Sequence, residues 1–116
     1  MADIVLVHGA WHGSWCWRRV APLLWLAGHR VVPVTLSGLG ERAHQRSPEI
    51  TLDTHVEDVV TAMRAEECSG AVLVGHSYGG LPVSAAALRL SCTRRSRSVR
   101  VASVSAATVV ARAVRV

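Results

Sequence analysis

The sequence predicts an α/β fold built on a doubly wound, mostly parallel sheet. Three short runs rich in β-branched residues, at 4–7, 31–35 and 71–74, alternate with segments whose apolar residues recur every three or four positions. Continuous apolar runs of this length are typical of strands buried on both faces of a parallel sheet. The alternation of strand and helix then predicts right-handed crossovers between neighbouring parallel strands.

Three helices are predicted around these strands. The first covers residues 17–27, where the apolar residues fall on one face and Gly28 provides a stop. The second begins at Thr54, which together with Glu57 has the spacing of a capping box. The third is expected from about residue 79 to 90. The apolar stripe of the second helix consists of Val56, Val59, Val60 and Met63.

Charge divides the chain of 116 residues into two parts near residue 88. Residues 1–88 contain six Arg against eight Asp and Glu, whereas residues 89–116 contain seven Arg and no acidic residue. We expect residues 1–88 to be the N-terminal part of a folded domain. Residues 89–116 are expected to be a basic tail, rich in Arg, Ser and Val, without native-like structure. Because this tail has no Trp, Tyr or Phe on which bases could stack, no specific nucleic-acid partner is predicted.

The N-terminus and the longest uncharged stretch bear on the location of the protein. No basic segment precedes an apolar run at the N-terminus, so the pattern of a secretion signal is missing. Residues 69–88 contain no charged residue, but polar residues, glycines and Pro82 interrupt them. They therefore predict a buried strand followed by a helix and no membrane span. A cytoplasmic protein is expected.

A serine flanked by glycines follows the third predicted strand. Residues 75–79, Gly-His-Ser-Tyr-Gly, match the pattern G-x-S-x-G and stand between a buried strand and a helix. A sharp turn in this setting exposes the serine hydroxyl at the carboxyl edge of the sheet, and the small flanking residues relieve crowding. Ser77 is therefore the candidate catalytic nucleophile for acyl chemistry.

Two main-chain amides are candidates for an oxyanion hole beside Ser77. The N–H of Tyr78, the next residue, is one donor, and the start of the following helix adds positive potential. The second donor is expected in the loop after the first strand, where Ala10 is the preferred residue and Trp11 a candidate for the substrate pocket. The stretch from His8 to His12 lacks the glutamate of H-E-x-x-H, so no metal site is predicted.

Three stretches together resemble the α/β-hydrolase superfamily, nearest to its esterase and hydroxynitrile-lyase branch. They are VLVHGAWHGSWCW at 5–17, GHRVVPVTLSGLGER at 28–42 and VLVGHSYGG at 72–80, and the likeness covers about residues 3–88. The resemblance implies a truncated α/β-hydrolase fold with a Ser-His-Asp triad and an oxyanion hole. It also implies a small-molecule ester or other acyl substrate, and neither a metal nor an organic cofactor.

The chain departs from the family pattern after Ser77. In that pattern the acid and the histidine of the triad follow the nucleophile, but residues 78–116 contain no Asp, Glu or His. A serine hydroxyl needs a base to accept its proton, so we expect the hydrolysis of carboxylic esters to be impaired. His8 and His12 are the two upstream candidates for a substitute base. For both of them, fixing the loop by hydrogen bonds and packing is the favoured interpretation.

A second hypothesis is a non-catalytic fragment, truncated or frame-shifted, that acts at most as a binding or association module. Charge, composition and resemblance all change near residue 88, which indicates that the later residues are not selected to fold. An unpaired sheet edge would then promote self-association. Whether the chain is an active enzyme is decided by the reactivity of Ser77.

Overall fold

The described residues form a single sheet of five strands. The computed structural model describes residues 1–91, 100–105 and 108–112. Four strands run parallel and the last is antiparallel, in the spatial order β2-β1-β3-β4-β5. The prediction of a mostly parallel sheet is confirmed. The strands are β1 (Asp3–Val7), β2 (Arg30–Val34), β3 (Val72–His76), β4 (Arg100–Ser105) and β5 (Thr108–Arg112).

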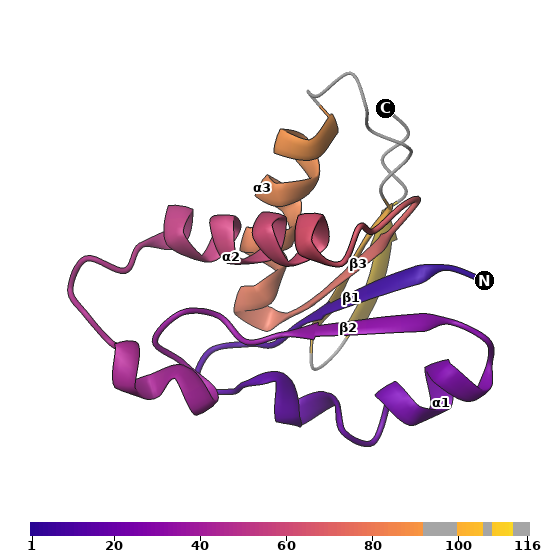
Figure 1. Cartoon of the computed structure of the whole chain (residues 1–116), viewed down its shortest axis with the longest axis horizontal. Coiled ribbons are helices and arrows are strands. Elements are labelled where there is room, and N and C mark those ends of the chain that lie inside the picture. Colours follow the sequence, from indigo (N-terminus) through magenta and orange to yellow (C-terminus); the bar gives the residue numbers. More distant parts are fainter. Residues whose placement is uncertain (92–99, 106–107, 113–116) are drawn as a thin grey trace.

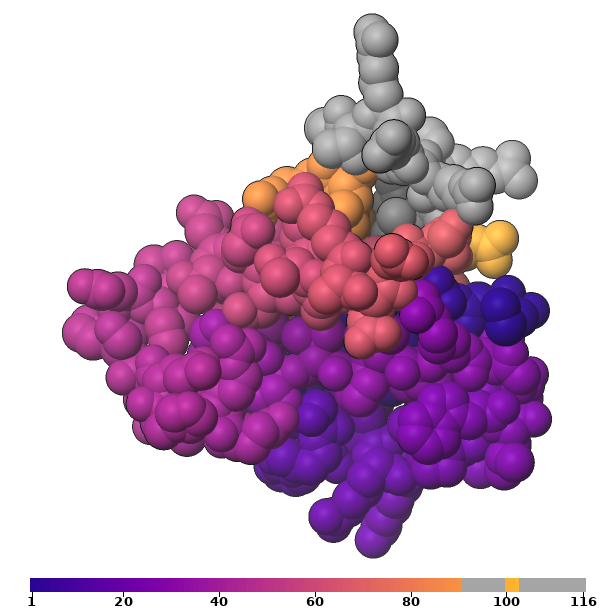
Figure 2. All heavy atoms as spheres, in the orientation of Figure 1, coloured from indigo at the N-terminus to yellow at the C-terminus, as the bar shows by residue number. Residues whose placement is uncertain are grey.

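Helices cover both faces of this sheet. Helix α1 lies on one face, and helices α2 and α3 lie together on the other (Figure 1). The space-filling view shows that the loop after β2 and the start of α2 form one continuous mass at one end of the molecule (Figure 2). The α-helices are α1 (Ala21–Leu26), α2 (Leu52–Ala65) and α3 (Gly80–Ser91). The short 3-10 turns are η1 (Ser14–Trp17), η2 (Gly40–Gln45) and η3 (Ser77–Gly79).

Strand β1 lies between β2 and β3 and is buried on both faces. Val5 and Val7 belong to the apolar cluster that includes α2 and α3, whereas Ile4 and Leu6 pack with Ala21 of α1. This alternation is expected of a strand covered by helices on two sides. Because β1, β2 and β3 are parallel, their carboxyl ends reach the same edge of the sheet. The segments that follow the three strands therefore meet there.

The first helix begins later than predicted. The sequence favours one helix over residues 17–27, whereas the structure has η1 ending at Trp17 and α1 starting at Ala21. Pro22 lies in the first turn of α1, where its missing N–H has no helical partner to lose. The proline thus marks the start of a short helix. Trp17 and Leu24 still pack on the same apolar cluster, which explains the periodicity of the sequence.

Helix α2 begins one turn earlier than predicted. Its N-cap is Thr51, whose hydroxyl accepts from the N–H of Thr54, while the Thr54 hydroxyl accepts from the N–H of Thr51 at 3.0 Å. The predicted capping box of Thr54 and Glu57 is therefore wrong by three residues. A threonine hydroxyl can accept as well as donate, so Thr54 fills the place that Glu or Gln usually takes. Glu57 instead forms an ion pair with Arg89 of α3 at 2.8 Å.

Strands β4 and β5 lie beyond the predicted boundary at residue 88. Strand β4 pairs in parallel with the whole length of β3, and β5 folds back on β4. The expectation of a tail without native-like structure thus differs from the structure at 100–105 and 108–112, whereas 92–99, 106–107 and 113–116 lie outside the described residues. The edge of β3 offers unpaired main-chain N–H and C=O groups. Strand β4 forms hydrogen bonds with these groups even though it begins with an arginine. The division of the chain at residue 88 stays a prediction.

No helix in residues 1–91, 100–105 or 108–112 is both long and apolar enough to cross a membrane. In the same residues, no three His, Cys, Asp or Glu side chains are grouped so that they could hold a metal ion. The uncharged stretch 69–88 is divided between β3 and α3, as the sequence predicts.

Candidate active site

Ser77 lies in a tight turn between β3 and α3, formed by residues 75–80 and called the serine turn below. It is the first residue of η3, and α3 begins three residues later at Gly80. Its φ is 52°, in the left-handed region that costs a non-glycine residue roughly 1–2 kcal/mol. The residue is exposed to solvent. Backbone strain at an exposed serine is typical of a functional site.

Glycines on both sides of Ser77 allow the serine turn to pack closely. A Cβ built on Gly75 would lie 2.5 Å from the main-chain oxygen of Gly79. A Cβ built on Gly79 would lie 2.6 Å from the main-chain oxygens of Val7 and His8 at the end of β1. The blocking atoms belong to the backbone and cannot rotate away, so only glycine fits. The serine turn therefore packs directly on the end of the neighbouring strand.

The loop after β1 runs beside Ser77. A Cβ built on Gly9 would lie 3.2 Å from the Cβ of Ser77 and 3.1 Å from the main-chain oxygen of His76. Ala10, the next residue, is exposed. Trp11 is 82% exposed and has a φ of 66°. The structure thus gathers the residues of the predicted site at one edge of the sheet: Ser77, Tyr78, Ala10 and Trp11.

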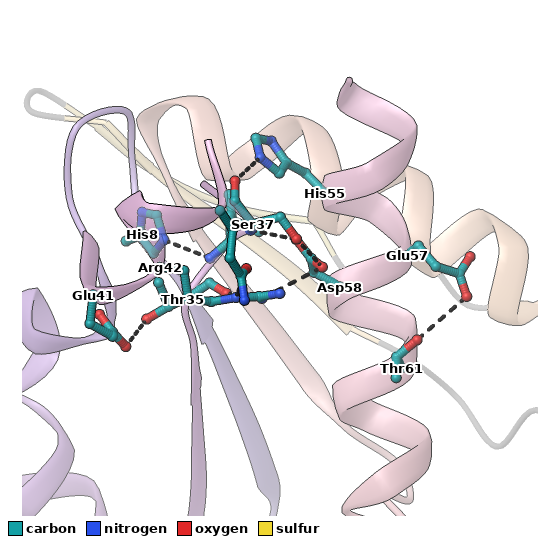
Figure 3. A network of polar contacts seen from close by, with 11 residues as sticks. His8, Thr35, Ser37, Glu41, Arg42, His55, Glu57, Asp58 and Thr61 are labelled. Carbon is teal, nitrogen blue, oxygen red and sulfur yellow. Dashed lines mark hydrogen bonds and ion pairs between the residues drawn. The ribbon is translucent and has the colours of Figure 1, made fainter. Parts of the chain in front are cut away.

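His8 links the ends of β1 and β2 (Figure 3). Its Nε2 accepts a hydrogen bond from the N–H of Leu36 at 3.0 Å, so Nδ1 carries the proton and donates to the oxygen of Gly9 at 2.7 Å. The side chain is fully buried, and burial lowers the pKa of His8, so the ring is neutral at neutral pH. Both ring nitrogens are bound to the main chain. His8 therefore fixes the loop that carries Ala10 and is not available as a base for Ser77.

His12 packs against other rings near the site. Its ring stacks on that of Trp15, with centroids 5.4 Å apart, and its centroid lies 6.2 Å from that of His76. Its Nδ1 is buried and has no hydrogen-bond partner within the described part of the chain. Of the two upstream candidates for a base, only His12 therefore keeps an unbound ring nitrogen among these residues.

A buried histidine on α2 contacts the serine turn, although no sequence motif pointed to it. His55 Nε2 donates to the main-chain oxygen of Ser37 at 2.9 Å (Figure 3), and Nδ1 accepts from the hydroxyl of Tyr78 at 2.7 Å. The two rings meet edge to face, with centroids 5.6 Å apart. Burial raises the pKa of the Tyr78 phenol, so it remains a donor at neutral pH. Its place directly before the apolar stripe that starts at Val56 indicates that the ring of His55 faces the core, but it does not indicate the partner.

Asp58 joins the loop after β2 to helix α2. Its carboxylate accepts from both the N–H and the hydroxyl of Ser37, each at 2.7 Å. Arg42 lies 3.6 Å from the same carboxylate and donates to the main-chain oxygen of Thr35 at 2.9 Å (Figure 3). Ser37 and Asp58 lie 21 residues apart in the sequence, so no local pattern reveals the contact between them.

A second carboxylate holds the loop after β2 from the other side. Glu41 accepts from the hydroxyl of Thr35 and from that of Ser14, the latter at 3.1 Å. The N–H of Ser14 in turn donates to the Thr35 hydroxyl at 2.9 Å. The hydrogen bond from Thr35 is the main cause that lowers the pKa of Glu41, which is ionised at neutral pH. These contacts connect the end of β2 with the start of η1.

Comparison with known proteins decides the family. A family model described as "Alpha/beta hydrolase family" matches residues 4–115. The chain belongs to this family. The resemblance and the fold class predicted from the sequence are therefore confirmed, and solved alpha/beta hydrolases share the fold.

Several alpha/beta hydrolases named for their activity resemble this one. The chain is 50% identical over 96 residues to a carbendazim-hydrolysing esterase of Nocardioides sp. (strain SG-4G). The aligned residues cover 83% of this chain and 40% of that esterase. It is 37% identical over 84 residues to an alpha-hydroxynitrile lyase of Arabidopsis thaliana, covering 72% of this chain and 33% of that one. Among solved structures, polyneuridine aldehyde esterase matches with a TM-score of 0.71 and 33% identity, over 78% of this chain and 36% of its own. The chain therefore spans well under half the length of these relatives.

Proposed function

We propose that this chain carries the nucleophile and the oxyanion hole of a carboxylic ester hydrolase. The observation that supports this most directly is the φ of 52° at the exposed Ser77, in a strand-to-helix turn beside the loop that carries Ala10. A serine displayed in this way is suited to attack a carbonyl carbon. Relatives named as esterases favour a small ester or acyl substrate.

In the proposed reaction, the oxygen of Ser77 adds to the carbonyl carbon of the ester. Negative charge then develops on the carbonyl oxygen, and the N–H groups of Ala10 and Tyr78 stabilise it. Collapse of the tetrahedral species breaks the bond to the alkoxide, which leaves as the alcohol with the proton lost from Ser77, and the acyl group stays on Ser77. Water then attacks the acyl carbon, which releases the carboxylic acid and returns a proton to the Ser77 oxygen. Trp11, exposed beside Ala10, is proposed to line the acyl pocket. None of these steps requires a cofactor.

The proton of Ser77 has no acceptor of the family type within this chain. Residues 78–116, where the pattern expects the acid and the histidine, contain no Asp, Glu or His. His8 is engaged through both ring nitrogens. We therefore propose that turnover by this chain is impaired, since loss of triad members costs on the order of 10⁶ in turnover in well-studied serine hydrolases.

The reactivity of Ser77 tests this function. We expect a fluorophosphonate probe to label Ser77 of the wild type slowly, because no triad histidine takes up the serine proton, and a short-chain aryl ester to be hydrolysed slowly as well. Both signals should be at background in Ser77→Ala. The matched control is Ser84→Ala, on the exposed side of α3, where the hydroxyl donates to the main-chain oxygen of Gly80 in its own helix. That variant should label like the wild type. Labelling that persists in Ser77→Ala, or a wild type that is not labelled, contradicts the proposal.

A second candidate function is an association module, which the surface of α1 favours. Leu23, Trp25 and Leu26 are 64%, 58% and 86% exposed. Neighbouring exposed apolar side chains mark association sites. The open edge at β2 is less suited to pair with a further strand, because Pro33 has no N–H to donate. We expect such a module to form dimers or larger species in sedimentation velocity, and a monomer at all concentrations contradicts it.

A cytoplasmic location and the lack of a specific nucleic-acid partner stay predictions.

A further inference from the structure

We propose that His55 is a positioning residue for the Tyr78 amide, which the proposed function places in the oxyanion hole. The catalytic meaning of this inference rests on that function. The observation behind it is the 2.7 Å hydrogen bond between His55 Nδ1 and the hydroxyl of Tyr78, the residue that directly follows Ser77. This bond connects α2, an element without any predicted site residue, to the serine turn.

The two hydrogen bonds of His55 determine which ring nitrogen accepts. The main-chain oxygen of Ser37 has no proton to give, so Nε2, which lies 2.9 Å away, carries one. In the neutral ring Nδ1 is then the acceptor, and the Tyr78 hydroxyl is the donor. The Tyr78 side chain is thereby held at its hydroxyl end, and the hydroxyl proton points toward Nδ1 of His55.

The position of His55 is itself fixed from two sides. Its side chain is buried on α2, and its partner Ser37 is bound through both N–H and hydroxyl by Asp58 at 2.7 Å. Asp58 stands one turn after His55 on the same helix, so α2 binds the loop after β2 at two neighbouring points (Figure 3). A ring held in this way offers Tyr78 a fixed acceptor.

The strain at Ser77 explains why the serine turn needs an anchor. A left-handed φ at a residue other than glycine persists only where the surroundings over-determine it. Before Ser77, β3 is fixed by its pairing with β1 and β4. After Ser77, η3 contains only Tyr78 and Gly79, and Gly79 has no side chain. Tyr78 is thus the residue of η3 that can anchor this side of the turn, and His55 is its partner.

Two substitutions separate the hydrogen bonds of His55. In His55→Asn the side-chain oxygen replaces the Nδ1 acceptor, whereas in His55→Gln the amide nitrogen replaces the Nε2 donor and leaves Tyr78 without a partner. Tyr78→Phe removes the hydroxyl from the other side. Thr51→Ala is the matched control, because it removes the N-cap of α2 and weakens the helix without touching either bond.

The hydrogen-exchange rate of the Gly80 N–H, measured by NMR, reports whether the serine turn is closed and does not depend on catalysis. The N–H of Gly80 bonds to the main-chain oxygens of Ser77 and Tyr78, so it is protected only while the turn is closed. We expect exchange to become about tenfold faster in His55→Gln and in Tyr78→Phe, the effect of one lost hydrogen bond. His55→Asn and Thr51→Ala should exchange like the wild type. The double variant His55→Gln/Tyr78→Phe should exchange no faster than either of its single variants, because the two substitutions remove the same hydrogen bond.

Labelling of Ser77 by the fluorophosphonate probe gives the functional reading. The labelling rate should fall about tenfold in His55→Gln and Tyr78→Phe, as expected for a misplaced oxyanion donor. His55→Asn, which keeps an acceptor for the Tyr78 hydroxyl, should keep most of the wild-type rate. The chain has a single tyrosine, so its ultraviolet titration follows Tyr78 alone. Burial raises the pKa of this phenol, and removing the acceptor to which its hydroxyl donates should lower that pKa in His55→Gln.

The outcomes separate this inference from the proposed function. Unchanged Gly80 exchange in His55→Gln overturns the inference, as does faster exchange with wild-type labelling. Faster exchange together with slower labelling supports it. If the wild type is not labelled at all, the proposed function fails, and the exchange of Gly80 still decides whether His55 anchors the serine turn.

Discussion

We expect Gly79→Ala to lower the free energy of unfolding by about 3 kcal/mol. A Cβ at this position would lie 2.6 Å from the main-chain oxygens of Val7 and His8, closer than real Cβ atoms approach other atoms. Overpacking costs about 1–3 kcal/mol, and the upper end applies because the blocking atoms are backbone at the end of a central strand. Urea unfolding followed by circular dichroism measures the loss, and labelling of Ser77 should be lost with it.

Gly70 provides the matched control, since it lies just before β3, the strand that leads into the serine turn. Apart from its chain neighbours, no atom of the described residues lies within 4 Å of a Cβ built on Gly70, and its φ is 60°. Asn adopts this left-handed conformation more readily than other side chains. We expect Gly70→Asn to change the free energy of unfolding by less than about 1 kcal/mol and to keep Ser77 reactive. Equal small losses in both variants would contradict the close packing of the serine turn on β1.

The serine turn could be predicted from the sequence because its determinants are local. Gly75, Ser77 and Gly79 lie within five residues, directly after an apolar run that has the length of a buried strand. The steric demand of the turn acts between these same residues, since the backbone of Gly79 blocks a side chain at position 75. A pattern in a short window therefore predicts the turn, although the steric demand at Gly79 comes from the end of β1.

The contacts that support the turn could not be predicted, because they join distant positions. His55 lies 23 residues from Tyr78 and 18 from Ser37 in the sequence. The period of an amphipathic helix shows which face is buried, but it does not show which loop a polar residue on that face meets. The partner of His55 depends on how α2 lies against the end of β2, and only the tertiary fold determines this.

The starts of α1 and α2 and the last strands differ from the prediction for two different physical reasons. Pro22 and Thr51 mark the observed starts of α1 and α2, and a shift of the start by one turn leaves the apolar period of the sequence intact. In β4 and β5, strand formation follows from pairing with an existing edge, and arginines at 100 and 112 hide the apolar pattern. Local composition thus underestimates segments that a sheet edge recruits.

The second large effect is expected at Asp3, at the beginning of β1. Its carboxylate accepts from Nε and Nη2 of Arg30, both at 2.9 Å, and from the N–H of Ser69 at 2.9 Å. One buried carboxylate thus joins the starts of β1 and β2 to the segment before β3. Breaking a buried pair costs roughly 3–5 kcal/mol, but the Arg30 side chain is 41% exposed and regains water. We therefore expect Asp3→Asn to lower the free energy of unfolding by about 2–3 kcal/mol at neutral pH.

This carboxylate also gives stability a defined dependence on pH. The hydrogen bonds from Arg30 and then from Ser69 hold the pKa of Asp3 below its ordinary value of 3.8. Since the folded state has the lower pKa, the contribution is fully present above the unfolded-state pKa and is lost as the pH falls through the folded-state value. The free energies of unfolding of the wild type and Asp3→Asn should differ at neutral pH and converge as the pH falls below 3.8 and through the lowered folded-state pKa of Asp3. Glu41, whose pKa is also lowered, is present in both proteins and cancels in the difference.

Asp53 separates the buried contact from a general effect of charge. It is exposed in the first turn of α2, so Asp53→Asn loses only a helix-dipole interaction of about 0.3–1 kcal/mol. Urea unfolding of the three proteins between neutral and acid pH makes the comparison. If the gap between the wild type and Asp3→Asn stays constant into acid, the charge of Asp3 is not its cause, because a protonated carboxyl and an amide bind Arg30 about equally poorly. If the gap closes while that of Asp53→Asn stays small throughout, the ionised Asp3 holds the amino ends of the strands together, at the edge of the sheet opposite Ser77.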